Sequence, residues 1–208
     1  MQSQQWSAEW QYPLVYLSQG MTILPSSAQE FLIEYGFPRV MIFDWQHPFE
    51  ISFELLEKDL VAYATGLNWG DFYNEVLDQE WRQQIRIGEE EFCNGHASFC
   101  VHAFEGTVSR IDCEISDPTC FVNSTLVQLG QSMLAAKKWS NRVHVDGALP
   151  TAEAFESLWD ELKRIDPLAF ENESCYWPNL IKTVLENPDD LQLDLQITND
   201  PAKSMPRF

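Results

Sequence analysis

The spacing of apolar residues alternates along the chain between the period of a helix and that of a strand. Towards the amino-terminal end, Ser27 and Glu30 form a Ser-x-x-Glu capping box ahead of apolar residues at helical spacing. Gly36 and then Pro38 provide the stop signal. This pattern predicts a short helix that buries one face.

Three later segments repeat the helical period. The first begins with Asn123 or Ser124 as its N-cap, the second begins with Thr151 as its N-cap, and the third covers residues 177–185. In the first two, apolar residues recur three and four positions apart, so each of these helices is predicted to pack one face against a core.

Strand-forming residues predominate in five further segments, and the short turns between them predict a meander. These segments are residues 40–45, 49–56, 84–88, 98–104 and 107–115. Glu105 and Gly106 join the last two in a tight hairpin. The combined pattern predicts an α+β fold, with a central, largely antiparallel sheet flanked by helices.

The length of 208 residues is enough for one domain with a full core. Residues 1–24 are predicted to form an arm, which is either irregular and packed on the domain or includes a short strand around residues 14–17. Residues 25–186 form the α+β domain, with a possible insertion at residues 46–83. The acidic end, residues 187–208, is predicted to be a loose tail.

Charge changes the picture more than any other feature of the composition. The 32 acidic residues outnumber the 13 basic ones, which gives a formal net charge of -19. Binding to nucleic acid draws its affinity from Lys and Arg, so no nucleic acid partner is expected. A basic protein would be attracted. The alternative is that the acidity only maintains solubility, and composition alone does not separate the two.

The five cysteines include no Cys-x-x-Cys pair, and their odd number argues against a disulfide framework. Both features favour a reducing compartment. The first 19 residues lack a basic residue and a continuous apolar stretch, and nowhere do about 18 apolar residues follow one another. We therefore expect a cytoplasmic protein that does not span a membrane.

One group of residues invites a zinc interpretation, because thiolates and imidazoles bind that metal. The group comprises Cys93, His96, Cys100, His102, Cys113 and Cys120. Structural zinc sites draw paired ligands from short knuckles, whereas Cys100 and His102 lie on a predicted strand. We therefore expect buried thiols and an ordinary histidine, with no metal and no cofactor. No catalytic motif is present either, so no enzymatic activity is expected.

Acidic side chains concentrate between Asp71 and Glu91, with aromatic residues among them. Aromatic anchors surrounded by charge are typical of a protein interface. The alternative is a solvated helix face whose aromatic residues pack inward. On the first interpretation the partner-binding residues are Trp69, Asp71, Glu75, Asp78, Glu80, Glu89, Glu90 and Glu91.

Several short motifs occur in an order that resembles the SUKH superfamily, and its fourth family most closely. The motifs are Phe-Leu-Ile-Glu-Tyr-Gly-Phe-Pro at 31–38, Ile-Gly at 87–88, Glu-Gly-Thr-Val at 105–108, Phe-Val-Asn-Ser-Thr-Leu at 121–126, Ile-Asp-Pro at 165–167, and Trp177. Phe37 stands where that family has Leu, and Thr125 stands where it has a second Ser. The long segment at residues 46–83 has no counterpart in these motifs.

The superfamily contains the Smi and Knr cell-wall regulators and many bacterial immunity proteins. The resemblance therefore implies an α+β immunity protein that binds and neutralises a polymorphic toxin. Such toxins are frequently basic nucleases or deaminases, and an acidic inhibitor can occupy a cleft that binds phosphate. The alternative is a regulatory scaffold that docks onto signalling or cell-envelope enzymes.

Overall fold

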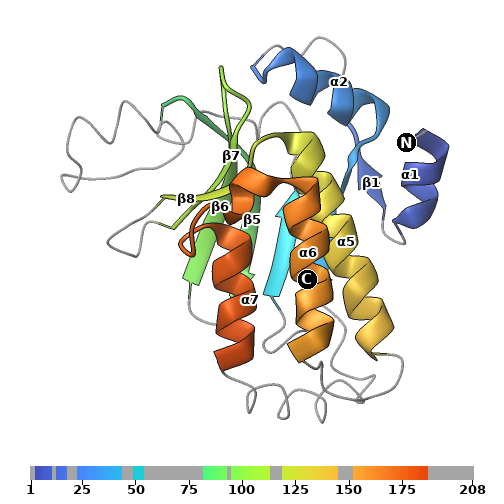
Figure 1. Ribbon diagram of the computed structural model, residues 1–208. Helices are drawn as coiled ribbons and strands as arrows, with labels where there is room; N and C mark the ends of the chain where they lie inside the picture. The colour runs from blue at the N-terminus through green and yellow to red at the C-terminus, as the bar shows by residue number, and fades with distance from the viewer. Residues whose placement is uncertain are drawn as a thin grey trace.

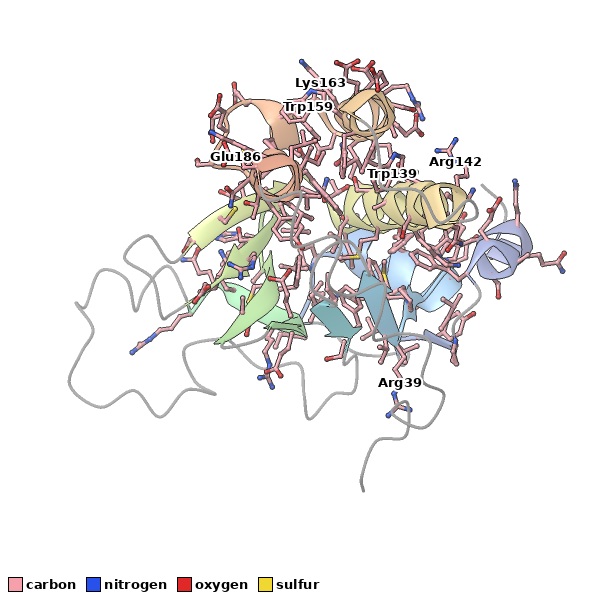
Figure 2. All side chains as sticks on the ribbon, turned by 90° about the horizontal axis from the view of Figure 1, so that it is seen from below. Arg39, Trp139, Arg142, Trp159, Lys163 and Glu186 are labelled. Atoms are coloured by element: carbon pink, nitrogen blue, oxygen red, sulfur yellow. The ribbon has the colours of Figure 1, made fainter. Side chains whose placement is uncertain are left out.

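The computed structural model describes most of the chain. The described residues are 3–10, 13–17, 23–43, 49–53, 82–92, 95–112, 119–144 and 152–186. Within them a six-stranded antiparallel sheet packs against helices, which confirms the predicted α+β class. Helices α5, α6 and α7 lie together on one face of the sheet (Figures 1 and 2).

The sheet is a meander in which each strand pairs with the next strand along the chain, as the sequence predicts. Its strands are β3 (Val40–Phe43), β4 (Phe49–Phe53), β5 (Gln84–Phe92), β6 (Gly95–His102), β7 (Val108–Ile111) and β8 (Thr119–Asn123). The long β5 and β6 occupy the centre of the sheet. Between Arg86 and Gly88 the register of β5 against β6 shifts by one residue, which marks a β-bulge.

The predicted helices are all present. They are α2 (Ser26–Glu34), α5 (Leu126–His144), α6 (Ala152–Ile165) and α7 (Tyr176–Glu186), with a short 3-10 helix η1 (Pro167–Phe170) between the last two. The predicted end of α2 is also correct, because Gly36 follows it with φ 70.

Two predicted helix caps are wrong. Helix α2 begins after Pro25, and no side chain caps it, so the capping box of Ser27 and Glu30 does not form. At the start of α5, Gln128 donates its backbone N–H to Oγ1 of Thr125 at 3.2 Å, so the N-cap is Thr125. Asn123 and Ser124 point elsewhere, because the buried Asp166 binds both of them.

The arm before residue 24 packs on the domain. It contains a helix that the sequence pattern did not predict, α1 (Ser3–Glu9), and a short strand β1 (Leu14–Val15) that pairs with β2 (Phe37–Pro38). Trp6 is buried, and its indole N–H donates to the carbonyl of Gly36 at 3.3 Å. Tertiary packing, rather than helix propensity, therefore holds this arm.

Much of the aromatic content of the chain forms one continuous path through the core. Ring centroids lie 4.5–6.3 Å apart along the sequence of contacts Trp6, Phe31, Phe37, Phe53, Phe99 and Tyr176. Pairs at these separations stabilise a core beyond the burial of their area. The path connects the amino-terminal arm, the sheet and α7.

Candidate functional site

Asp166, at the end of α6, is the centre of a buried polar cluster that we call the Asp166 junction: Asn123, Ser124, Asp166 and Trp177. Asp166 is 1% exposed. Its Oδ2 accepts from the backbone N–H of Ser124 at 2.6 Å and from Nδ2 of Asn123 at 3.1 Å, and its Oδ1 accepts from the Ser124 hydroxyl at 2.8 Å. The indole N–H of Trp177 donates to Oδ1 of Asn123 at 3.1 Å.

The Asp166 junction explains three of the sequence motifs together. The motifs at residues 121–126 and 165–167 and Trp177 come from β8, the start of α5, the end of α6 and α7, and they meet here. Buried donors and acceptors must be paired, and these side chains pair with one another. The junction therefore holds the fold, and its polar groups are already in use.

A second buried cluster, the Glu90 network, joins β5, β7 and α7. Glu90 is 5% exposed, although the sequence interpretation placed it on a binding surface. The Tyr176 hydroxyl donates to Oε1 of Glu90 at 2.8 Å, and Nε of Arg110 binds Oε2. Nη2 of Arg110 also lies 3.4 Å from Oδ2 of Asp112. Burial, with the nearby charge of Glu90, raises the pKa of Tyr176 well above its usual value.

The neighbouring Glu89 points to the opposite face of the sheet from Glu90. Its side chain is 39% exposed, and Oε1 lies 2.5 Å from Nη1 of Arg86. In register, Glu89 stands opposite Ser52 of β4, and Glu91 stands opposite Glu50. We call Glu50, Glu89 and Glu91 the acidic strip.

The remaining predicted contact residues lie outside the described residues. They are Trp69, Asp71, Glu75, Asp78 and Glu80. Of the predicted set, then, the structure separates Glu89 from Glu90, gives the strand register of Glu91, and leaves the other five as a prediction.

The candidate zinc residues have other uses where the structure describes them. Cys100 is buried within β6, opposite Ser109 of β7. His102 bonds through Nε2 to Oε1 of Gln83 at 2.9 Å, and its Nδ1 accepts from the backbone N–H of Glu105 at 3.1 Å. Within the described part of the chain, no three His, Cys, Asp or Glu side chains come together as a metal site would require. Cys93 and Cys113 fall outside it.

The helical layer carries a shallow groove of about 830 Å³ between α5 and α6. Trp139 and Arg142 of α5 line it (Figure 2). Its other cations are engaged: Nζ of Lys138 lies 2.6 Å from Oε2 of Glu9, and Nη2 of Arg164 lies 2.8 Å from Oε1 of Glu161. The groove holds ion pairs and an aromatic wall, with no histidine or cysteine in its lining.

One exposed residue was not among the predicted contacts. Phe104 was assigned to the end of a strand, but it lies in the turn between β6 and β7 and is 80% exposed. An aromatic residue next to the Glu105-Gly106 turn signal was the available clue, since turn positions point their side chains into solvent.

These features define a class of protein: an α+β domain whose buried polar groups serve the fold. The family model for the SUKH-4 immunity protein matches residues 21–185, so the chain belongs to the SUKH-4 family of immunity proteins. This bears out the resemblance found in the sequence motifs. Searches of the curated proteins and of the solved structures found no match.

Membership of an immunity protein family implies a cognate toxin as the partner. The matched residues run from just before α2 to the last turn of α7, and they include both the Asp166 junction and the Glu90 network. No helix in the described ranges has the length and apolar character that a membrane span requires.

Proposed function

We propose that this protein binds and neutralises a basic toxin domain, such as a nuclease or a deaminase, by direct contact and without chemistry of its own. The single observation that carries the proposal is the match to the immunity protein family over residues 21–185. The net charge of -19 supports a basic partner, because unlike charges steer the encounter and raise the association rate.

The acidic strip is the proposed site of electrostatic contact. Glu89 is exposed, and Glu91 stands opposite Glu50 in register. A Lys or Arg of the toxin at this position would form a charge-assisted hydrogen bond with the exposed Glu89. We propose that the segment from Asp71 to Glu80 extends this contact.

The test uses the purified protein and a catalytically inactivated copy of the toxin domain encoded beside its gene. Association and dissociation rates are measured at low and high salt. The double variant Glu89→Lys, Glu91→Lys is expected to slow association about tenfold or more at low salt, and the difference should shrink as salt screens the charges. Glu156→Lys, an exposed residue of α6, is the matched control and should have a smaller effect.

Two results would contradict the proposal. One is the absence of binding by the native protein, together with failure to protect cells that express the active toxin. The other is an association rate indifferent to ionic strength, which would remove the electrostatic part. If the protein instead captures only signalling or cell-envelope enzymes, the scaffold alternative gains support.

A further inference from the structure

Phe104 stands out among the apolar residues of the described surface. Single apolar side chains that are partly exposed are ordinary on protein surfaces. Phe104 differs because it is 80% exposed, whereas the other large exposed apolar residues in the described parts reach 55% at most. Among the described residues its one aromatic neighbour is the ring of His102, whose centroid is 6.1 Å away. Phe104 therefore adds little to the core of the domain.

The turn that carries Phe104 is held firmly by hydrogen bonds. The backbone N–H of His102 donates to the carbonyl of Thr107 at 2.8 Å, and that of Gly106 donates to the carbonyl of His102 at 2.9 Å. The backbone N–H of Glu105 donates to the His102 ring at 3.1 Å. Gly106 has φ 77, which a residue with a side chain rarely adopts. The backbone that carries the ring is thus held in place, so little backbone entropy is lost on binding.

The turn lies where the predicted acidic segment rejoins the sheet. Arg82 and Gln83 are the first described residues after Glu80. The carbonyl of Gln83 accepts from the backbone N–H of Ala103 at 2.7 Å, so this strand entry is bonded to the base of the turn. Phe104 therefore lies beside the end of the segment proposed to meet the toxin.

Phe104 and the acidic strip are close enough to share one partner. Gln84 pairs with His102 at one end of the β5–β6 ladder, and Glu91 pairs with His96 near the other. Seven residues of strand span roughly 23 Å. An interface of standard size buries about 800 Å² on each side, which corresponds to a compact patch roughly 30 Å across. One toxin domain can cover both ends.

We propose that Phe104 is the apolar anchor of the toxin contact and that its ring enters an apolar pocket of the cognate toxin. This inference rests on the proposed function. Glu105 follows Phe104 and is exposed, so a pocket with Lys or Arg at its rim would complement this tip of the molecule. The two contacts divide the binding kinetics: the acidic strip governs association, and the Phe104 ring governs dissociation.

The test measures the binding kinetics of Phe104→Ala against the inactivated toxin domain encoded beside the gene. A buried aromatic anchor at an interface contributes enough that its truncation should raise the dissociation rate about 30-fold or more. The association rate and its salt dependence should stay within about twofold of the native values, because no charge changes. The dissociation rate of Phe104→Leu, which keeps an apolar side chain, should lie between those of the native protein and Phe104→Ala.

Leu185→Ala is the matched control, because Leu185 is also an exposed apolar residue, at 44%, near the end of α7. The β6–β7 turn and the end of α7 lie at opposite ends of the molecule (Figure 1). Leu185→Ala should leave the dissociation rate unchanged. The melting temperature of Phe104→Ala should stay within about 2 °C of the native protein, since exposed residues affect stability little.

The possible outcomes are distinct. If the native protein binds the toxin and Phe104→Ala dissociates at the native rate, the anchor is elsewhere and the inference is wrong. An equal increase in the dissociation rate of Leu185→Ala would also overturn the inference. So would sedimentation experiments in which Phe104→Ala changes only the self-association of the protein. Absence of binding by the native protein would overturn the proposed function and this inference together.

Discussion

The two faces of the six-stranded sheet each carry a glutamate of β5, but the two glutamates differ in burial and in their bonding partners. On the face towards α7, Glu90 is buried and bonded to Arg110 and Tyr176. On the opposite face, the next residue back along the strand, Glu89, is exposed and has only Arg86 as its ion-pair partner within the described residues. A carboxylate that the fold already uses is a poor contact for a toxin, which is why Glu89 and not Glu90 is kept in the proposed contact.

The largest loss of stability is expected at Asp166, because several polar groups beneath the helices depend on this single carboxylate. Asp166→Ala removes the acceptor for three donors: the buried side-chain amide of Asn123, and the partly buried backbone N–H and hydroxyl of Ser124. Each buried donor left unpaired costs about 1–3 kcal/mol, so the free energy of unfolding should fall by about 4 kcal/mol. Urea unfolding followed by circular dichroism measures this change. The exposed Asp160→Ala should cost less than about 0.5 kcal/mol, and an equal cost at both positions would contradict the comparison.

A smaller effect separates the two neighbouring glutamates directly. Glu90→Ala leaves Arg110 and Tyr176 without their shared partner and should lower the free energy of unfolding by about 3 kcal/mol. Glu89→Ala should change it by less than about 0.5 kcal/mol, because a solvent-exposed ion pair contributes little. The same urea measurement compares the two variants. Similar losses for both would mean that the faces do not differ as described.

The smallest expected effect is a pH dependence of the free energy of unfolding that comes from Tyr176, on the helix-facing side of the sheet. Because the pKa of Tyr176 is higher in the folded state than in the unfolded state, the unfolded chain loses this proton first as pH rises. The contribution to stability is therefore complete below about pH 10 and declines above it, by at most about 1.4 kcal/mol per pH unit. Tyr176→Phe should cost about 1 kcal/mol at pH 7 and should show a shallower loss of stability above pH 10. Parallel curves for the two proteins would argue against a buried, neutral Tyr176.

The order and pairing of the strands followed from local signals in the sequence. The Glu105-Gly106 turn and the short connections between strand segments fix a meander, because consecutive antiparallel strands pair with one another. The apolar stripes located α5 and α6 for the same reason: their periodicity is local. Helix α1 was missed because Trp6 is held by contacts with residues about 30 positions away, such as Gly36.

Other features depend on contacts that no local pattern contains. Asn123 meets Asp166 across 43 positions and Trp177 across 54, so the motifs were visible separately while their meeting point was not. Glu90 was placed on the surface because it lies in an acidic run with Glu89 and Glu91, and strand alternation would not have corrected this. Simple alternation from Ile85 would turn Glu90 outward and Glu89 inward, and the extra residue at Ile87 reverses this assignment.

The bulge has a further consequence for the Glu90 network, because it decides which face of the sheet each following side chain of β5 occupies. A β5 without the bulge would keep plain alternation, which would turn Glu89 towards α7 and carry Glu90 away from Arg110 and Tyr176. An uncompensated carboxylate against the helices is costly. Gly88 is consistent with this register, because a Cβ at this position would lie 2.5 Å from the carbonyl oxygen of Ser52. The buried ion pair of Glu90 and Arg110 therefore favours one register of β5, the register in which Glu89 points away from α7.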